Sequence, residues 1–554
     1  MTRAEEAFQT WLKKSTDAEV NAQLEALKGD EKKRTNAFYK ELEFGTGGLR
    51  GELGAGTNCL NVYTIRKVTQ GVADCMKAHG YKKAAISYDS RLGSALFART
   101  AAEVFAANGV TAYLTKKLMP TPFLSYITRR FGADIGVMIT ASHNPARYNG
   151  YKVYGADGCQ LTDSGALEMT GYINAVDPFD VRTESLEHYL SAGLVRYVGE
   201  EITEEFLAKV FAVRTGLAEG LKVTYTPLNG TGRELVPEIL RRMKVQELSL
   251  VPEQMTVDGN FPTCPYPNPE KAEALEAGLK YAEENDSDLL IATDPDCDRV
   301  GTAIRTEHGY VLLTGNEVGV LLADYLLAQK KAAGTLPKSP VIVKTIVTTD
   351  LVRKVAQSYG AEIYEVLTGF KYIGETIGRL EKRGEAERYL LGLEESYGYL
   401  SGTYVRDKDG VNAAMLVAEM AAHYKRQGKT LVDRINEIYQ TYGLYRHRLV
   451  SYEFGGAEGN SKMKRLLESL RADLPKEIAG AKVVKTVDYL TQREAELPRA
   501  NVLSFRMEDG SSMIVRPSGT EPLIKIYMTA CDSSEQANEK KFRAMQQQLA
   551  AWFA

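Results

Sequence analysis

The stretch Val137-Met-Ile-Thr-Ala-Ser-His-Asn-Pro145 is an apolar run that ends abruptly at a serine. Residues 135–139 are short, largely β-branched or apolar, and bounded by a glycine and a proline, which predicts a buried strand. Ser142 would then lie just beyond the carboxyl end of the strand, where open α/β sheets hold their ligands. Downstream, Tyr148-Asn-Gly-Tyr-Lys152 predicts a tight turn that brings Lys152 back toward the serine hydroxyl. An ordinary polar turn also fits this stretch, so the rest of the chain has to decide.

The order strand, helix, strand, helix, strand occurs three times, over residues 84–141, 221–292 and 340–393. Such alternation predicts crossover units on largely parallel sheets, and hence three related α/β domains. In each copy the most unusual loop follows the third strand, so the three loops meet if the copies face one cleft. Residues after about Tyr442 lose the pattern and predict a separate C-terminal α+β domain. We therefore expect domains over residues 1–205 (with N-terminal amphipathic helices), 206–310, 311–442 and 443–554.

Three aspartates follow the last strand of the second copy, in Thr293-Asp-Pro-Asp-Cys-Asp-Arg299. Carboxylates this close repel one another unless a cation neutralises them. Oxygen ligands in this number suit Mg²⁺, which keeps positions open for water or a phosphate oxygen. The glycine and glutamate that an EF-hand requires are absent. We therefore predict that Asp294, Asp296 and Asp298 form a metal site rather than a solvated acidic turn.

The third copy places polar side chains at the corresponding position. Glu394 and Ser396 are of the kind that hydrogen-bond sugar hydroxyls, although a helix cap would explain them equally well. Lys371 follows a strand and is expected near the same edge, and Lys408 lies on a polar turn. Each lysine taken alone is more often a surface cation than a substrate ligand.

Two further loops contain arginines. Phe44-Gly-Thr-Gly-Gly-Leu-Arg-Gly51 predicts a glycine-rich loop that holds Arg50 and lets backbone approach a ligand, although a plain connection is commoner. Val515-Arg-Pro-Ser-Gly-Thr-Glu-Pro522 combines a guanidinium fork, two hydroxyls and free backbone N–H groups. Those groups together can hold a phosphate dianion.

Composition excludes several classes of protein. The 554 residues carry a net charge of −3, so no basic footprint indicates nucleic-acid binding. The six cysteines contain no Cys-x-x-Cys pair, which favours reduced thiols in a cytosolic protein. No apolar leader or membrane-length stretch is present. We expect a cytoplasmic monomer or weak dimer without nucleic-acid or membrane partners.

Four signatures together span the chain and resemble those of the α-D-phosphohexomutases, the phosphoglucomutase and phosphomannomutase family. The stretches Phe44–Gly51 and Tyr148–Lys152 are most similar to those of the bacterial phosphoglucomutase branch, near the phosphoglucomutase-2 and phosphopentomutase proteins. The resemblance implies three related α/β domains and a fourth α+β domain, arranged as a heart around a central cleft. The signatures are Thr140-Ala-Ser-His-Asn-Pro145, Asp294-Pro-Asp-Cys-Asp-Arg299, Glu394-Glu-Ser396 and Arg516-Pro-Ser-Gly-Thr520.

The resemblance also implies a role for each site residue. Ser142 would carry a phosphoryl group, an oxygen of which completes a Mg²⁺ site with the three aspartates, and glucose 1,6-bisphosphate would be the bound intermediate. Lys152, an acid/base candidate, would lie near the transferring group with Arg50 and His143. Sugar hydroxyls would contact Glu394 and Ser396. The non-reacting phosphate would be held by Arg516, Ser518, Gly519 and Thr520, and the remaining cleft residues would be Arg299, Lys371 and Lys408.

Two positions depart from the family pattern: Asn229 stands where close relatives commonly have histidine, and Cys297 replaces a usual small residue. Neither removes a predicted catalytic group. The favoured activity is a phosphoglucomutase acting on small sugar phosphates, with phosphomannomutase or phosphopentomutase as alternatives. A non-catalytic phosphosugar-binding protein has no need of the serine, lysine and aspartates together, and a net phosphatase would need water to reach the phosphoserine.

Overall fold

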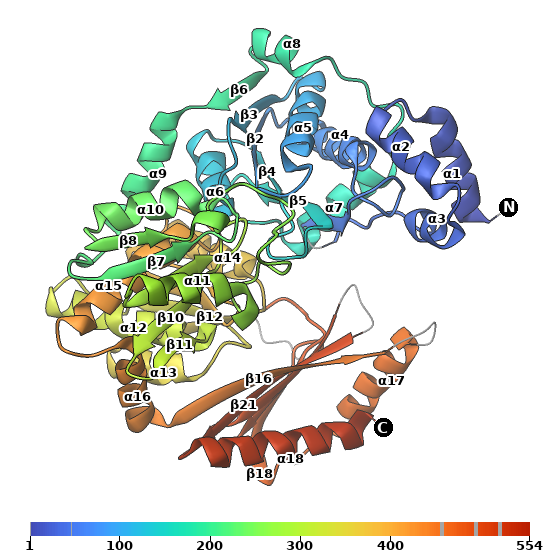
Figure 1. Cartoon of the computed structure of the whole chain (residues 1–554). Helices are drawn as coiled ribbons and strands as arrows, with labels where there is room; N and C mark the ends of the chain where they lie inside the picture. The colour runs from blue at the N-terminus through green and yellow to red at the C-terminus, as the bar shows by residue number, and fades with distance from the viewer. Residues whose placement is uncertain (1, 46, 455–458, 492–496, 519–522, 554) are drawn as a thin grey trace.

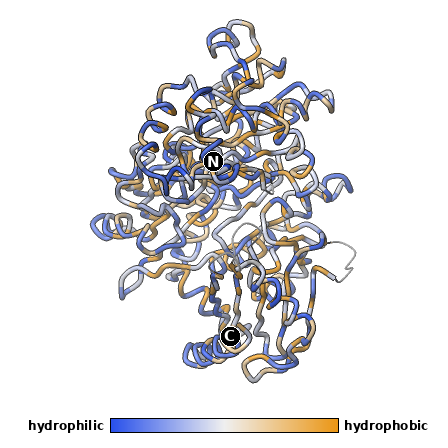
Figure 2. The backbone as a smooth tube through the Cα atoms, turned by 90° about the vertical axis from the view of Figure 1, so that its right-hand side faces the viewer, coloured by the Kyte–Doolittle hydropathy of each residue, from blue (hydrophilic) through white to orange (hydrophobic). Residues whose placement is uncertain are grey.

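The computed structural model describes residues 2–45, 47–454, 459–491, 497–518 and 523–553. The chain forms four sheets, three in the upper body of Figure 1 and one in the orange and red domain below them. None of the helices in these ranges has the length and apolar composition needed to cross a bilayer. Apolar and polar stretches instead alternate along the whole tube in Figure 2.

The first domain is built on a six-stranded sheet in the order β1-β5-β4-β2-β3-β6. The strands from β4 to β6 in this order run parallel, whereas β5 is antiparallel to both β4 and β1. The strands are β1 (Gly48–Glu52), β2 (Lys83–Tyr88), β3 (Thr111–Thr115), β4 (Ile135–Ile139), β5 (Tyr148–Gly155) and β6 (Val195–Val198). The helices are α1 (Arg3–Lys14), α2 (Ala18–Leu27), α3 (Glu31–Phe38), α4 (Val62–Ala78), α5 (Ser94–Ala107), α6 (Thr121–Arg130), α7 (Asp163–Asn174) and α8 (Leu186–Ser191).

The N-terminal helices pack on this domain, as their apolar spacing predicts. Phe8, Trp11 and Phe38 are buried in the same apolar cluster as Tyr63 of α4. The aromatic rings meet edge to face, with 5.4 Å between the centroids of Trp11 and Tyr63.

The second domain repeats the arrangement with a five-stranded sheet in the order β11-β10-β9-β7-β8. Its core strands are parallel, and β10 is antiparallel to both neighbours. The elements are α9 (Glu200–Ala212), β7 (Lys222–Thr226), α10 (Gly232–Arg242), β8 (Glu247–Leu250), η1 (Pro252–Gln254), α11 (Ala272–Glu284), β9 (Leu289–Thr293), β10 (Val300–Thr306) and β11 (Gly309–Leu313).

The third domain has a four-stranded sheet, β13-β12-β14-β15, in which only β15 is antiparallel. Its elements are α12 (Gly315–Ala332), β12 (Val341–Thr345), α13 (Leu351–Ser358), β13 (Glu362–Val366), α14 (Phe370–Lys382), η2 (Ala386–Arg388), β14 (Tyr389–Glu394), β15 (Gly398–Leu400), α15 (Gly410–Lys425) and α16 (Leu431–Tyr442).

The fourth domain is α+β, with every strand pair of its sheet β16-β21-β20-β19-β18-β17 antiparallel. The three α/β domains and the α+β domain are therefore confirmed, while the residues at which one domain ends and the next begins stay predictions. The elements are β16 (Leu444–Glu453), α17 (Gly459–Ala472), β17 (Glu477–Ile478), β18 (Ala481–Asp488), β19 (Leu503–Met507), β20 (Ser512–Pro517), β21 (Leu523–Asp532) and α18 (Glu535–Phe553).

Candidate active site

The same hairpin occurs in each of the first three domains. A parallel core strand (β4, β9 or β14) turns back into an antiparallel strand (β5, β10 or β15). Each connecting loop contains one non-glycine residue with left-handed backbone, with φ of 52° at Ser142, 53° at Cys297 and 66° at Tyr397. The three loops are thus related in topology and local conformation, and they provide the serine, the aspartates and the predicted sugar-binding residues.

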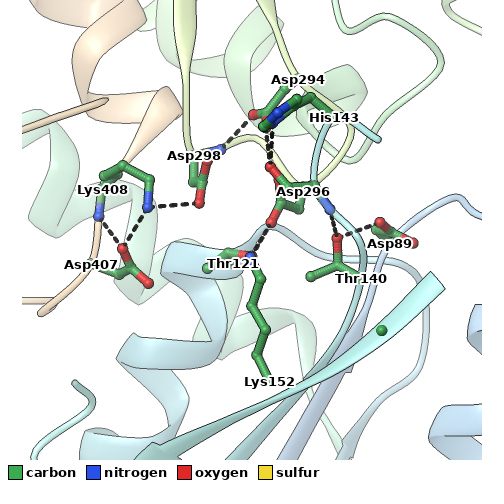
Figure 3. A network of polar contacts seen from close by, with 12 residues as sticks. Asp89, Thr121, Thr140, His143, Lys152, Asp294, Asp296, Asp298, Asp407 and Lys408 are labelled. Atoms are coloured by element: carbon green, nitrogen blue, oxygen red, sulfur yellow. Dashed lines mark hydrogen bonds and ion pairs between the residues drawn. The ribbon is translucent and has the colours of Figure 1, made fainter. Parts of the chain in front are cut away.

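The Ser142 hydroxyl lies against the aspartate loop of the second domain. Its Oγ donates a hydrogen bond to Oδ2 of Asp294 at 2.8 Å and lies 3.1 Å from Nδ1 of His143. The Ser142 backbone N–H donates to Thr140 Oγ1, and that hydroxyl donates to Asp89 Oδ2 at 2.6 Å (Figure 3). The serine is therefore buried and held from both its backbone and its side chain.

The three aspartates are buried and lie close enough together to share a cation. One carboxylate oxygen of each lies within 4.8 Å of the others. Burial, and then the charges of Asp296 and Asp298, raise the pKa of Asp294 well above its usual value. Burial and Asp296 likewise raise the pKa of Asp298. The cluster thus holds more negative charge than this buried space stabilises without an additional cation.

Three cations already pair with this cluster. Lys152 Nζ lies 3.0 Å from Asp296 Oδ2, Lys408 Nζ lies 3.0 Å from Asp298 Oδ2, and Arg299 Nε lies 3.9 Å from Asp298 Oδ1. Burial opposes ionisation of Asp296, but Lys152, the hydrogen bond with Asp294 and the charge of Lys408 together outweigh burial and hold the pKa of Asp296 below its ordinary range. In the described part of the chain Asp294 is in no ion pair, so it is the carboxylate with the least compensated charge.

Two carboxylate oxygens, Asp296 Oδ1 and Asp298 Oδ1, are buried and have no hydrogen-bond partner among the described residues. Buried oxygens of this kind are costly unless a cation or donor reaches them. The donor set, three carboxylates beside a serine hydroxyl, matches the all-oxygen coordination of Mg²⁺. The residues present therefore fit a divalent ion.

Lys152 reaches the aspartates from a strand, not from the predicted turn. Residues 148–152 belong to β5, where Lys152 is opposite Met138 of β4. Arg50 is also in a strand rather than a loop, on β1 beside β5, and its Nη1 donates to Asn144 Oδ1 at 2.7 Å. Both predictions of local structure were wrong, although both side chains lie near the serine loop.

Arg91 is a site residue that the sequence analysis missed. Its guanidinium is buried and donates to the backbone carbonyls of Ser142 and Asn144, and Nη1 also donates to the carbonyls of Pro145 and Tyr148 at 3.0 Å. The guanidinium carbon lies 5.1 Å from the ring centroid of Phe261 in the second domain. One side chain thus holds the serine loop and contacts the neighbouring domain.

Thr121 and Asp407 were missed as well. Thr121, in the first turn of α6, donates its hydroxyl to Asp296 Oδ2 at 2.9 Å. Asp407 lies 3.0 Å from Lys408 Nζ, so Lys408 lies between two carboxylates (Figure 3). Lys408 is a half-buried cation here, with 13% of its side chain exposed, rather than a fully exposed surface charge.

Glu394 is within electrostatic range of Lys408. It is buried, with 6% of its surface exposed, and its Oε1 accepts the backbone N–H of Gly369 at 3.0 Å. Burial raises its pKa to about 7, while Lys408 opposes that rise. Ser396 lies half-buried in the same hairpin loop.

Arg299 and Lys371 are each paired with a carboxylate outside the aspartate cluster. The Arg299 guanidinium pairs with Glu270, and its backbone N–H donates to Asp294 Oδ1 at 3.0 Å. Lys371, in the first turn of α14, lies 2.7 Å from Asp163 of α7. Lys371 therefore links the third domain to the first.

The fourth domain places Arg516 at the end of β20, beside β21. Arg516 lowers the pKa of Tyr527 on β21, whereas burial and Glu395 raise that pKa to about 12. Arg516 of the fourth domain and Glu395 of the third therefore shift the pKa of Tyr527 in opposite directions. The backbone N–H of Ser518 donates to Leu523 at 2.8 Å. Gly519 and Thr520 lie outside the described residues.

The two departures from the family pattern have structural explanations. Asn229 has left-handed backbone with φ of 59°, which asparagine tolerates, and its Nδ2 donates to the carbonyls of Glu253 and Thr256. Cys297 is fully buried, and burial raises the pKa of its thiol well above the usual value. Neither residue is a hydrogen-bond partner of Ser142 in the described part of the chain.

Family models for the phosphoglucomutase/phosphomannomutase α/β/α domains I, II and III match residues 41–178, 200–309 and 314–442, and the C-terminal domain model matches 459–544. A phosphoglucomutase of Staphylococcus haemolyticus is 36% identical over 91% of this chain and 93% of its own length. One of Staphylococcus aureus is 34% identical over 94% of each.

Solved structures share the fold. A phosphoglucomutase/phosphomannomutase family protein of Burkholderia thailandensis superposes with a TM-score of 0.69 at 19% identity, covering 92% of this chain and 97% of its own. The Paramecium phosphoglucomutase parafusin, in its open form, also gives 0.69 at 19% identity, covering 93% of this chain and 95% of its own. This chain, whose serine loop and buried aspartates meet in one site, belongs to the phosphoglucomutase/phosphomannomutase family of intramolecular phosphotransferases, which are isomerases.

Proposed function

We propose that the chain is a phosphoglucomutase that interconverts α-D-glucose 1-phosphate and glucose 6-phosphate through phosphoserine 142, with glucose 1,6-bisphosphate as bound intermediate. The observation that carries this proposal is the 2.8 Å hydrogen bond from the Ser142 hydroxyl to Asp294, within a cluster of three buried aspartates. The protein would be a cytoplasmic monomer or weak dimer. The relatives named phosphoglucomutase, which align over most of the chain, support glucose as the sugar.

Asp294, Asp296 and Asp298 would hold Mg²⁺ beside the phosphoserine. The ion supplies charge neutralisation at the transferring phosphoryl group. Phosphorylation of Ser142 adds nearly two negative charges to a region that already contains three carboxylates. The cation is therefore needed both for the resting phosphoenzyme and for transfer.

In the transfer step, the bond between Ser142 Oγ and phosphorus breaks as the free hydroxyl oxygen of the sugar phosphate bonds to phosphorus. The sugar hydroxyl loses its proton, and Ser142 Oγ regains one. We assign this exchange to His143, because its Nδ1 lies 3.1 Å from Oγ and burial lowers its pKa well below the usual value. The Asp296 and Asp298 charges outweigh burial and raise the pKa of Lys152, which favours a charged donor over a base.

The second half of the reaction needs the intermediate to turn end over end. Arg516 and Ser518, with Gly519 and Thr520, would hold whichever phosphate is not reacting, so the clamp must accept both orientations. Glu394 and Ser396 would bind the sugar hydroxyls, while Lys408, Arg299, Lys371 and Arg50 would supply positive charge around the substrate. Closure of the fourth domain would exclude water, which would otherwise hydrolyse the phosphoserine.

The decisive experiment is Ser142→Ala, assayed with glucose 1-phosphate, added Mg²⁺ and a trace of glucose 1,6-bisphosphate. Turnover should fall by a factor on the order of 10⁴ or more, because the phosphoryl carrier is gone. Intact mass should show a labile phosphate on the unmodified protein and none on the variant. Ser164→Ala, an exposed serine on α7, is the matched control. Near-normal turnover in the Ser142 variant would refute the phosphoserine role.

Two further measurements complete the test. EDTA should abolish activity and Mg²⁺ should restore it, and indifference to the chelator would remove the aspartates from the reaction. A panel of glucose, mannose and ribose 1-phosphates measures sugar preference through kcat/KM. A higher value for mannose or ribose phosphate would replace glucose by that substrate and leave the phosphoserine chemistry intact.

A further inference from the structure

A second group of potential metal ligands lies in the first domain, apart from the aspartates. Cys75 on α4, His79 at the C-terminal cap of α4 and Glu168 on α7 each offer one atom within 4.8 Å of the others. His79 Nε2 lies 3.3 Å from Glu168 Oε1, and the Cys75 Sγ lies 3.9 Å from His79 Nδ1. Thiol, imidazole and carboxylate are thus gathered at one point between two helices.

The hydrogen bonds of His79 determine which nitrogen can bind a cation. Nδ1 lies 3.0 Å from the Cys75 backbone carbonyl, which can only accept, so Nδ1 carries the hydrogen. Nε2 then directs either a lone pair or a second proton at the Glu168 carboxylate. A lone pair and a carboxylate oxygen at 3.3 Å repel each other unless a cation lies between them. A backbone carbonyl bound to the other ring nitrogen is the usual support of a metal-ligating histidine.

The helix packing brings the three side chains together before any cation arrives, and binding then turns the Cys75 thiol from Nδ1, 3.9 Å away, toward Nε2. A Cβ on Gly71 of α4 would lie 2.5 Å from the Cα of Ile173 on α7, so the helices touch there backbone to backbone. Cys75 and His79 are one and two turns beyond that contact, and Glu168 lies more than one turn back along α7. The His79 ring is also stacked on Tyr81, with 5.3 Å between centroids. The imidazole therefore has little freedom to turn away.

We propose that Cys75, His79 and Glu168 form a binding site for a zinc-class divalent cation. Tetrahedral zinc with usual bond lengths places a nitrogen and an oxygen ligand roughly 3.4 Å apart, close to the 3.3 Å between Nε2 and Oε1. Thiolate and imidazole select zinc over the magnesium expected at the all-oxygen site. On binding, the Cys75 thiol releases its proton to solvent, and water takes the fourth position.

The site is separate from the catalytic chemistry. His79 precedes β2 at the amino end of the parallel strands, whereas Ser142 follows β4 at the carboxyl end. The two sites thus lie at opposite edges of one sheet. Zinc bound here would fasten α7 to α4 and stabilise the first domain, without contact with the substrate.

The test is a Zn²⁺ titration of the full chain in excess Mg²⁺, followed by calorimetry and thermal melting. We expect one zinc per chain with a rise in Tm, and at least tenfold weaker binding in Cys75→Ser, His79→Gln and Glu168→Gln. Controls are Cys59→Ser, a half-buried thiol of the same domain, and His188→Gln. Co²⁺ bound to the unmodified protein should show a thiolate-to-metal absorption band.

Wild-type affinity in both the Cys75 and His79 variants would overturn the proposal. So would a Co²⁺ spectrum without the thiolate band, because that measurement needs no variant that has to fold. Mutase activity in the same variants, measured without Zn²⁺, should match that of the unmodified chain. The outcome is therefore independent of whether Ser142 carries phosphate.

Discussion

The first three domains and the fourth are attached in different ways. A single apolar cluster runs through the first three, from Met138 through Tyr225 and Val300 to Leu393. The fourth domain has its own core around Phe505, and three of its buried apolar residues in the described part of the chain join the larger cluster, with five partly buried ones packed against it. Those three are Tyr445, Val502 and Ile514.

Charged contacts make up much of the remaining attachment. Arg506 of β19 pairs with Glu365 and Asp350 of the third domain, and Arg446 of β16 pairs with Glu317. Apolar interfaces resist opening, whereas partly exposed ion pairs are weak and are screened by salt. The serine and the aspartates are therefore joined through one continuous apolar core, whereas Arg516 is on a domain that is attached partly by ion pairs.

Arg91→Lys should produce the largest effect, because Arg91 holds the serine loop in position. Lysine cannot donate to the carbonyls of the serine loop as a fork, and a displacement of about 1 Å at the reacting oxygen costs on the order of 100-fold in rate. We expect kcat to fall by about that factor with a smaller change in KM. Steady-state kinetics and phosphoserine content by mass measure it. Arg99→Lys, an exposed arginine of α5, is the control, and a kcat within threefold of normal would contradict the prediction.

Glu394→Gln tests the third-domain loop whose charges act, together with Arg516 of the fourth domain, on Tyr527. The pKa of Glu394 is about 7 in the folded chain, above its usual 4.5. A raised pKa means that the stability tied to this group is fully present below pH 4.5 and is lost as pH rises through 7, a loss of roughly 3 kcal/mol. Glutamine removes the burial cost of the charge, so the variant should melt higher than the unmodified chain at pH 8 and similarly at pH 4.5.

The same substitution should lower kcat/KM by roughly 10- to 100-fold, because a charged hydrogen bond to a sugar hydroxyl is lost. Glu375→Gln, an exposed glutamate of α14, is the control for both measurements. Equal melting temperatures at pH 8 would contradict the prediction. They would mean that neighbouring groups offset the cost of burying the Glu394 charge.

Arg506→Gln should give the smallest effect, because it weakens only the ion pairs that attach the fourth domain to the third. The ion pair of Arg506 Nη2 with Glu365 at 2.8 Å is partly exposed, so its loss is worth at most about 1 kcal/mol. We expect KM to rise two- to fivefold at low salt with kcat little changed, and the difference to vanish at high salt. Arg353→Gln is the matched control, because Arg353 pairs with the same two carboxylates within the third domain. An equal rise of KM in both variants would mean that attachment of the fourth domain does not cause the change.

The sequence predicted the repeated part of the fold well. The strand expected over 135–139 is β4, and the three site loops do follow the third strand of each copy. Two strands were mistaken for a turn and a loop because they contain glycines. A Cβ at Gly48 would lie 2.5 Å from the carbonyl oxygen of Tyr151 on β5, and one at Gly150 would lie 2.9 Å from that of Leu49 on β1. These glycines therefore allow neighbouring strands to approach closely, and they do not mark turns.

Arg91 could not be identified from the sequence because its partners are backbone carbonyls more than 50 residues away. One signal was available: Asp89-Ser-Arg91 follows β2 at the same carboxyl edge as Ser142. Lys408 was underrated for a related reason, since its carboxylate Asp298 comes from another domain. Contacts between domains leave little trace in local sequence.

The left-handed backbone of Ser142 has a consequence for the choice of nucleophile. Threonine carries the same hydroxyl, yet its branched Cβ is strongly disfavoured at φ of 52°. A chain with threonine here would have to relax toward an extended conformation, which would turn the oxygen out of the aspartates' reach. The hydroxyl alone therefore does not explain why residue 142 is a serine. The left-handed backbone of the loop also disfavours threonine, the other side chain with an aliphatic hydroxyl.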